Sequence, residues 1–313
     1  AEEEPVTYKA YLWAETELLS TTIKEENYFE VTPETVVLES NEVYVVKGTV
    51  TVESRIECGQ NVKLVLTDDS VLNAGKGIHV RGSLEICGSG TVNSELTRID
   101  KGISNIGVNA GEKACDITVH GGQLNLSHTG DASCIDAGSG SYSQYAGTVN
   151  GRSYDGDGIR AGTLTVYGGE VQCESDIEAG IAAYTVTING GDICCEGGYG
   201  AGIEGKDIII NEGSVRATSN AGAGIGGGAV VDNDTIRPLV TACNSITING
   251  GGISVDSYDG AGIGSGVGYA LYTIFSRYAL QRGYGSNVIN FYTCALAAVG
   301  AMLIWGVKGS FDI

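Results

Sequence analysis

Short runs of alternating hydrophobic and polar residues recur along this chain with a spacing of 22 residues. A Gly-Ile step marks the repeats at Gly158-Ile159, Gly180-Ile181, Gly202-Ile203 and Gly224-Ile225, and returns 22 plus 16 residues later at Gly262-Ile263. Alternation of this kind is typical of strands with one buried face. A repeat of about 20 to 30 residues predicts a solenoid, in which each unit buries its apolar face against its neighbours.

Equivalent hydrophobic residues fall into columns when four repeats are aligned. The aligned runs are TLTVYGGEVQC from Thr163, TVTINGGDICC from Thr185, DIIINEGSVRA from Asp207 and SITINGGGISV from Ser245. Five inward columns are expected: Leu164, Val186, Ile208 and Ile246; Val166, Ile188, Ile210 and Ile248; Val171, Ile193, Val215 and Ile253; Cys173, Cys195, Ala217 and Val255; and the isoleucines of the Gly-Ile steps. Three short strands per repeat, stacked at about 4.8 Å, predict an all-β parallel β-helix with about 22 residues per coil over residues 46–266.

A polar column is expected at the turn between two of these strands. Asn189, Asn211 and Asn249 occupy equivalent positions there, and Tyr167 and His120 take the same place in earlier repeats. Stacked asparagines form hydrogen bonds along the axis, and the glycines that follow them adopt backbone angles that other residues avoid. We therefore interpret these asparagines as structural.

Three segments depart from the period. Residues 1–45 do not follow it, and we expect an N-terminal cap or an irregular segment there. Residues 132–154 match the template less well, so a loop is expected within them. Residues 227–242 form a 16-residue excursion, and long excursions of solenoids often carry function.

The repeat ends at Gly266, and residues 267–313 have a different character. Residues 288–307 are 20 residues without a charge, which as a helix matches the thickness of a bilayer core. A membrane anchor is one interpretation of this hydrophobic segment, which we expect to be helical. A packed helix or subunit contact within a filament is the second, and an artefact of the reading frame is the third.

Composition and charge narrow the classes of partner. The formal net charge is −20, which repels phosphate backbones and excludes a nucleic-acid partner, whereas it favours solubility and divalent cations. An acidic, lysine-poor and glycine-rich repeat chain is typical of exported proteins, so we expect an extracellular or cell-surface location. The nine cysteines include no Cys-x-x-Cys pair, which argues against a zinc site. Cys173 and Cys195 share an inward column, and Cys194 is expected to face outward.

Carboxylates in outward positions are the weak candidates for a metal site. Glu170 is expected one coil from Asp192, and Glu174 one coil from Glu196, so that each pair lies about 5 Å apart. Such pairs either remain a solvated acidic face or recruit a cation, for which calcium is the natural choice. No cofactor besides calcium is suggested by the sequence.

The segment SYDGDGIR concentrates the remaining candidate chemistry. Asp155 and Asp157 offer hard oxygen ligands on a flexible loop, and Arg160 follows the adjacent Gly-Ile step. A calcium-dependent polysaccharide lyase needs a cation to neutralise a uronate carboxylate and a base to remove the neighbouring proton. These residues supply both in principle, with Arg160 as the weak catalytic candidate, although Asp-Gly steps are also common in turns.

The runs LVLTDDSVLNAGKGIHV, ITINGG, AGIGGG and AGIGSG resemble the glycine-rich, pectin-lyase-like repeats of secreted or surface proteins from gut Firmicutes. The likeness covers roughly residues 40–266. It implies a right-handed β-helix and an extracellular setting, often described as adhesin-like or carbohydrate-binding, and it implies no established reaction.

The function expected from the sequence is that of a non-catalytic surface or structural protein. Its partners would be glycans or other surface proteins, with copies of the chain in a homo-oligomer or filament, and a membrane at residues 288–307. The alternative is a calcium-dependent polysaccharide lyase or another polysaccharide-active enzyme. Few catalytic groups converge in the sequence, which favours the first expectation.

Overall fold

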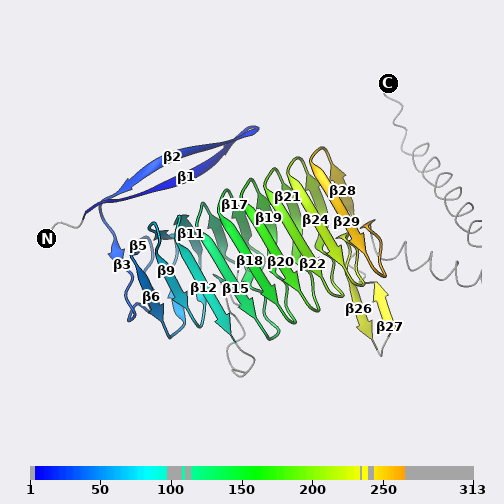
Figure 1. The fold of residues 1–313 in the computed structure, drawn as a ribbon, viewed down its shortest axis with the longest axis horizontal. Helices are drawn as coiled ribbons and strands as arrows, with labels where there is room; N and C mark the ends of the chain where they lie inside the picture. Colours follow the sequence, from blue (N-terminus) through cyan, green and yellow to red (C-terminus); the bar gives the residue numbers. More distant parts are fainter. Residues whose placement is uncertain (1–3, 97–107, 110–113, 233–234, 239–242, 265–313) are drawn as a thin grey trace, which may run out of the picture. The chain divides into compact units, whose positions relative to one another are not determined.

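The chain folds as a β-solenoid of about eight coils with about 22 residues per coil (Figure 1). The computed structural model describes residues 4–96, 108–109, 114–232, 235–238 and 243–264. These residues form strands and turns and contain no helix, which confirms the predicted all-β parallel architecture. The predicted hydrophobic segment 267–313, with residues 288–307, lies outside them. Within the described ranges, no helix has the length and apolar character needed to cross a membrane.

One face of the solenoid is a nine-stranded parallel sheet in which neighbouring strands lie one coil apart. Along each strand, apolar residues that face the core alternate with residues at the surface, as period-two patterning requires. In order along the solenoid, the strands are β6 (Thr49–Val52), β9 (Val71–Ala74), β12 (Thr91–Leu96), β15 (Gln123–His128), β18 (Thr148–Ser153), β20 (Glu170–Ser175), β22 (Asp192–Gly197), β24 (Ser214–Ser219) and β29 (Gly252–Ser257).

The remaining parallel strands form two rows, which the longest strands join. The row that carries the Gly-Ile steps contains β4 (Val37–Leu38), β7 (Ile56–Cys58), β10 (Ile78–Val80), β13 (Val108–Asn109), β16 (Ile135–Asp136), β25 (Ile225–Gly226) and β30 (Ile263–Gly264). The adjoining row contains β3 (Phe29–Glu30), β5 (Val43–Val46), β8 (Val62–Leu66), β11 (Ser83–Gly88), β14 (Asp116–Val119), β17 (Ser141–Gln144) and β28 (Ser245–Ile248). Three strands span both rows: β19 (Ile159–Val166), β21 (Ile181–Ile188) and β23 (Ile203–Ile210).

The predicted inward columns are confirmed by the register of these strands. Ile188 pairs with Val166 on one side and with Ile210 on the other, and Ile210 pairs with Ile248. Cys173 pairs with Cys195, which pairs with Ala217. Most members of the columns are buried in one continuous core that extends along the solenoid. The solenoid is therefore held together by apolar contacts between successive coils.

The loop that we expected within residues 132–154 is replaced by three strands in register, β16, β17 and β18. The pattern is weak there because Tyr142 and Gln144 occupy the inward positions that Leu164 and Val166 take in the next coil. Tyr142 Oη donates a hydrogen bond of 2.7 Å to Gln144 Oε1, and Gln144 Nε2 donates to the carbonyl oxygens of Gly147 and Glu170. These buried polar groups are satisfied, so the coil keeps its shape.

The N-terminal residues contain a hairpin and the first strands of the solenoid. β1 (Val6–Ala14) and β2 (Glu17–Glu25) pair with each other as an antiparallel hairpin. β3 and β4 lie within residues 1–45, and they already pair in parallel with β5 and β7. The parallel strands therefore begin at Phe29. In the excursion at residues 227–242, β26 (Ala229–Asp232) and β27 (Thr235–Pro238) form a second antiparallel hairpin.

The first hairpin packs on the turn column of the solenoid. Tyr8 is buried with Val45, Val65 and Cys87, which precede His120 in this column. The backbone N–H of Tyr11 donates to His120 Nδ1 at 3.2 Å, and burial lowers the pKa of His120, which keeps the ring neutral and able to accept.

From His120 onwards, the turn column consists first of aromatic side chains and then of asparagines. The rings of His120 and Tyr145 stack at 4.9 Å and those of Tyr145 and Tyr167 at 4.6 Å, and Trp13 of the hairpin lies 5.1 Å from Tyr167. The predicted asparagine stack follows, with Asn211 Nδ2 donating to Asn189 Oδ1 and Asn249 Nδ2 donating to Asn211 Oδ1, both at 2.7 Å. The three asparagines therefore stack and form hydrogen bonds to one another along the axis, and their structural role stays our interpretation.

Candidate functional site

The predicted residues Asp155, Asp157 and Arg160 come together in a hollow that we call the acidic pocket. The pocket has a volume of about 470 Å³ and is also lined by Asp131, Ala132, Ser133, Asp136, Gly156, Glu178, Ala182 and Glu204. The parallel register explains this gathering, because Asp136 pairs with Arg160 and Ala182 pairs with Glu204 on neighbouring coils. Acidic residues from four coils thus surround one arginine.

Asp157 has the most perturbed carboxyl group of the acidic pocket. Desolvation raises its pKa to about 7, because the group has lost most of its contact with water. The backbone N–H of Ala179 donates to Asp157 Oδ1 at 3.1 Å and partly offsets this effect. A carboxyl group that titrates near neutral pH is able to take up and release a proton, which is the property of a general acid or base.

Two glutamates of the pocket are perturbed in the same direction. Burial raises the pKa of Glu204, whose Oε2 accepts a long hydrogen bond of 3.5 Å from the N–H of Ala201. Burial and the nearby Asp155 raise the pKa of Glu178. Arg160 is exposed and forms no ion pair within the described part of the chain. The pocket therefore combines protonatable carboxyl groups with one free guanidinium.

The other predicted metal ligands lie elsewhere, on the nine-stranded sheet. Glu170 pairs with Asp192 and Glu174 pairs with Glu196, so the stacking expected from the repeat is confirmed. Neither pair belongs to the acidic pocket. Among the described residues, no three His, Cys, Asp or Glu side chains are grouped so as to hold a metal ion. Calcium binding therefore stays a prediction.

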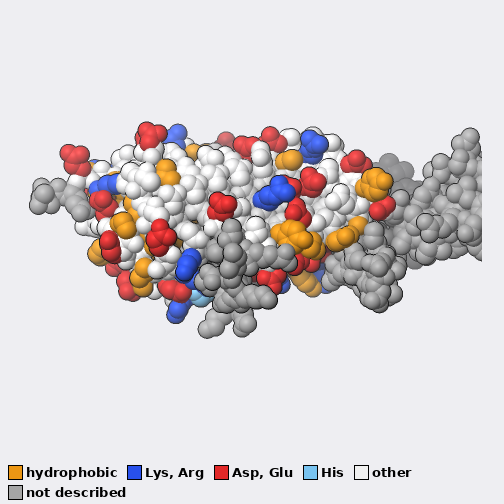
Figure 2. Space-filling view, turned by 60° about the horizontal axis from the view of Figure 1, so that its bottom comes forward, with side chains coloured by type: hydrophobic (Ala, Val, Ile, Leu, Met, Phe, Trp, Pro, Cys, Tyr) orange, Lys and Arg blue, Asp and Glu red, His pale blue; other side chains and the backbone are white. Residues whose placement is uncertain are grey.

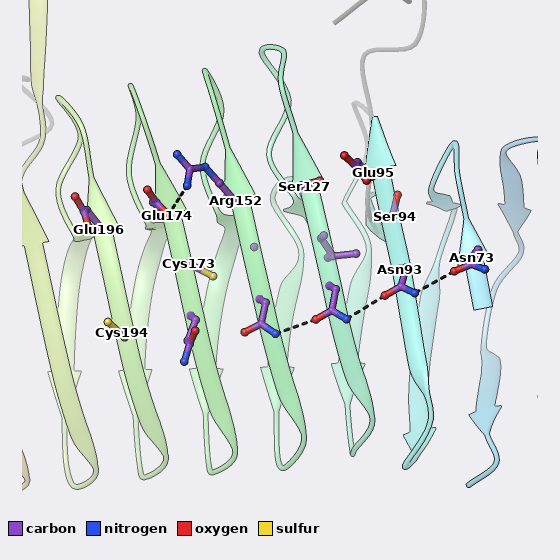
Figure 3. Close-up of a pocket in the computed structure, with 15 residues that line it drawn as sticks. Asn73, Asn93, Ser94, Glu95, Ser127, Arg152, Cys173, Glu174, Cys194 and Glu196 are labelled. Carbon is purple, nitrogen blue, oxygen red and sulfur yellow. Dashed lines mark hydrogen bonds and ion pairs between the residues drawn. The ribbon is translucent and has the colours of Figure 1, made fainter. Parts of the chain in front are cut away.

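A larger hollow, which we call the amide groove, lies on the outer face of the nine-stranded sheet (Figure 3). It has a volume of about 640 Å³, within the usual range of ligand sites. Its floor is a ladder of amides, in which Asn93 Nδ2 donates to Asn73 Oδ1 at 3.0 Å, Asn125 Nδ2 donates to Asn93 Oδ1 at 3.0 Å, and Asn150 Nδ2 donates to Asn125 Oδ1 at 2.9 Å. Gln172 and Cys194 continue the same column on β20 and β22.

A second row of side chains, which we call the charged row, runs beside the amide ladder (Figure 3). Its members are two residues further along each strand and pair in register: Glu95, Ser127, Arg152, Glu174 and Glu196. Arg152 forms exposed ion pairs with Glu174 at 3.3 Å and with Asp176 at 3.4 Å. The groove is therefore lined by three carboxylates and one guanidinium. Figure 2 shows carboxylates spread over the face of the molecule that it presents.

Ser94 is a buried hydroxyl without a partner. It is 3% exposed and its Oγ forms no hydrogen bond. Ser94 alternates on β12 with Asn93 and Glu95 and pairs with Leu126 of the buried core, so its side chain faces the core and not the amide groove. A buried hydroxyl without a partner costs about 1–3 kcal/mol of stability.

The cysteines of the described residues are free thiols. Cys173 and Cys195 are buried neighbours in one column, as predicted, and desolvation raises the pKa of both thiols. Cys194 is exposed on the groove, which confirms its predicted outward position. The two buried thiols therefore act as small hydrophobic groups.

The amide groove was not predicted from the sequence. Successive members of its ladder are 20, 32 and 25 residues apart, so they do not repeat at the 22-residue spacing that revealed the turn column. A search for asparagines after an alternating run, with coil length left free, would have found Asn73, Asn93, Asn125 and Asn150.

Comparison of the chain with protein-family models, with curated proteins and with solved structures gave no match. The resemblance to pectin-lyase-like repeat proteins therefore stays a prediction, and the fold and the two sites rest on the structure itself.

Proposed function

We propose that this chain is a non-catalytic glycan-binding protein of the extracellular surface, and that the amide groove is its binding site. The observation that supports this proposal most directly is the ladder Asn73–Asn93–Asn125–Asn150 on the floor of the groove. Asn93 uses one hydrogen and one lone pair along the ladder, which leaves a donor and an acceptor for a ligand. Asn125 keeps a free donor, because its Oδ1 accepts from both Asn150 Nδ2 and Gln123 Nε2. Sugar hydroxyls are both donors and acceptors, so they match this pattern.

The geometry of the groove also suits a polymer. The ladder crosses successive parallel strands, so its amide groups repeat about every 4.8 Å along the solenoid. A chain of sugars presents hydroxyls repeatedly along one direction, and several weak contacts made at once give useful affinity. A small isolated ligand would use only part of this surface.

Glycan binding by paired amide variants tests the proposal. In Asn125→Ala/Asn150→Ala, the groove loses two of its amides, and we expect affinity for a bound oligosaccharide to fall at least tenfold. The matched control is Asn189→Ala/Asn211→Ala, which removes two stacked amides from the turn column outside the groove. A glycan array identifies the ligand class and calorimetry measures affinity, with thermal unfolding as the check on folding. Equal losses in both variants, or no binding across the array, would overturn the proposal.

A polysaccharide-active enzyme is the second candidate, because Asp157 has a pKa of about 7 and lies in one pocket with Arg160. In this function, Asp157 would be the general base and Arg160 would neutralise a uronate carboxylate. Incubation with uronate polymers and calcium would give unsaturated products that absorb in the ultraviolet, and Asp157→Ala and Arg160→Ala would each abolish them. No turnover on any acidic glycan would remove this candidate.

A further inference from the structure

The hairpin β1–β2 is held on the solenoid by few contacts. Of the residues in its two strands, Tyr8 alone is buried, and the others are half-buried or exposed. The N–H of Tyr11 donates to His120 Nδ1 at 3.2 Å, and the ring of Trp13 contacts that of Tyr167. Elements with so little buried surface open locally at a low cost in free energy. A change at the His120 contact therefore alters a large share of what attaches the hairpin.

His120 accepts this hydrogen bond only while Nδ1 carries no proton. A protonated imidazole has an N–H at both ring nitrogens, so Nδ1 of a charged His120 would face the N–H of Tyr11 donor to donor. His120 is 9% exposed, and desolvation lowers its pKa, because burial disfavours the charged ring. Protonation under the closed hairpin therefore costs both the hydrogen bond and the burial of a charge.

The groups around the His120 ring leave this cost largely uncompensated. Glu85 of β11 raises the pKa of the ring and Lys63 of β8 lowers it, but desolvation outweighs both and the net shift is downward. Cys87 of β11 is neutral, because burial raises its pKa to about 12, and β17 presents the uncharged ring of Tyr145 in a stack at 4.9 Å. The hairpin itself contributes a backbone N–H.

We propose that the hairpin β1–β2 is a pH-sensitive strap, which closes over the turn column while His120 is neutral and opens when this ring takes up a proton. In the open state the ring is in water and titrates near its ordinary pKa of about 6.5, whereas in the closed state its pKa is lower. Closure is therefore fully stable above this range and is lost as pH falls through it. Opening uncovers Tyr145 and Tyr167, so this aromatic surface becomes accessible in acid.

The turn column supplies a counterpart of His120 that does not titrate. Asn189 and Asn211 occupy the same position in later coils, and the Oδ1 of each accepts a hydrogen bond. An asparagine thus fits this turn and keeps an acceptor, so His120→Asn removes the titratable ring alone. His128 is the matched control, because it is also buried, its pKa is also lowered by burial, and its Nδ1 accepts from two N–H groups of its own loop.

Thiol labelling of the complete chain at pH 7 and at pH 5 measures the opening of the strap. The reagent 4,4′-dithiodipyridine reacts with thiols at both pH values, and mass spectrometry resolves the labelled sites. Cys87 is 0% exposed and packs against Tyr8 of the hairpin. Cys194 is exposed and corrects for the change of thiol reactivity with pH, whereas Cys173 reports on the solenoid core. The protection of Cys87 is the ratio of the Cys194 rate to the Cys87 rate.

The variants are expected to differ in how this protection changes with pH. In the wild type, the protection of Cys87 should fall by about 5- to 20-fold from pH 7 to pH 5, because the open hairpin lets His120 bind a proton that the closed hairpin excludes. In His120→Asn the change should be less than twofold. His120→Lys places a fixed charge beneath Tyr11, so protection should be low at both pH values. His128→Asn should keep the response of the wild type.

Three outcomes would overturn the strap. The first is equal protection of Cys87 at pH 7 and pH 5 in the wild type. The second is an unchanged pH response in His120→Asn. If that variant is unprotected already at pH 7, His120→Gln, whose amide has a longer reach, takes its place under the same criterion. The third is a parallel loss of protection at Cys173, which would mean that acid loosens the solenoid as a whole.

Discussion

Single polar residues in this protein are perturbed most strongly where a coil buries them. Asp157 and Gln144 are both surrounded by protein, with different consequences. Gln144 is neutral and finds three hydrogen-bond partners, so its burial is well tolerated. Asp157 must lose water around a charge, and its pKa rises from 3.8 to about 7. The cost of ionising Asp157 therefore becomes part of the folding equilibrium.

The pH dependence of stability tests this cost. Between pH 4 and pH 7 the unfolded chain has released the Asp157 proton while the folded chain still holds it, so the stability of the fold decreases as pH rises. In Asp157→Asn this contribution disappears, while Oδ1 can still accept from Ala179. We expect the variant to be more stable than the wild type by about 1–3 kcal/mol at pH 8 and to show little gain at pH 4. Chemical denaturation at both pH values measures the difference, and a gain that is the same at both would contradict the assignment.

At the scale of elements, the hairpin β1–β2 covers the part of the turn column whose side chains are apolar or aromatic. The column is apolar or aromatic where the hairpin packs, from Val45 to Tyr167, and it becomes asparagine from Asn189 onwards. Hydrophobic side chains at a turn need a cover, whereas stacked amides satisfy one another and tolerate water. The hairpin and the column are therefore complementary parts of one interface.

Removal of one anchor of the hairpin should expose the column beneath it. We expect Trp13→Ala to lose the ring contact with Tyr167 and to favour local opening by about 1–3 kcal/mol. Cys87, which is buried against Tyr8, should then react faster with a thiol reagent. Cys173 is the internal control, because it lies in the solenoid core and should stay protected. Mass spectrometry resolves the two sites, and equal rates for Cys87 in variant and wild type would disprove the covering role.

At the scale of the whole molecule, stability depends on contacts between adjacent coils. Each inward side chain touches its equivalents one coil away, so a defect is felt by two neighbours. Ile188 has such a neighbour on both sides and is 0% exposed, whereas Ile248 in the same column is 42% exposed. An isoleucine therefore contributes more to the stability of the fold in the middle of the column than at its end.

Alanine substitutions within this column measure the difference. Ile188→Ala should lower the free energy of unfolding by about 2–5 kcal/mol, because it leaves a cavity between two coils. Ile248→Ala should cost less than about 1 kcal/mol, since its side chain is already partly in water. Urea denaturation followed by circular dichroism gives both values. Similar costs at the two sites would contradict the stacking that the register shows.

The sequence by itself determined the features that repeat. The 22-residue spacing gave the parallel coils, the inward columns, the asparagine turn stack and the carboxylate pairs, because residues one period apart must lie one coil apart in a solenoid. It also brought Asp155, Asp157 and Arg160 together as a candidate site, because they are close in the chain.

Only the tertiary structure decided the features that do not repeat. The hairpin of β1 and β2 packs on the turn column through contacts such as the hydrogen bond between Tyr11 and His120, which are 109 residues apart, and no local pattern encodes such a contact. The amide ladder joins asparagines from coils of unequal length. Asp136 and Glu204 join the acidic pocket through the register of neighbouring strands. Periodicity fixes which residues share a coil position, whereas the packing of unequal coils and of non-repeating elements depends on contacts that form only in the folded chain.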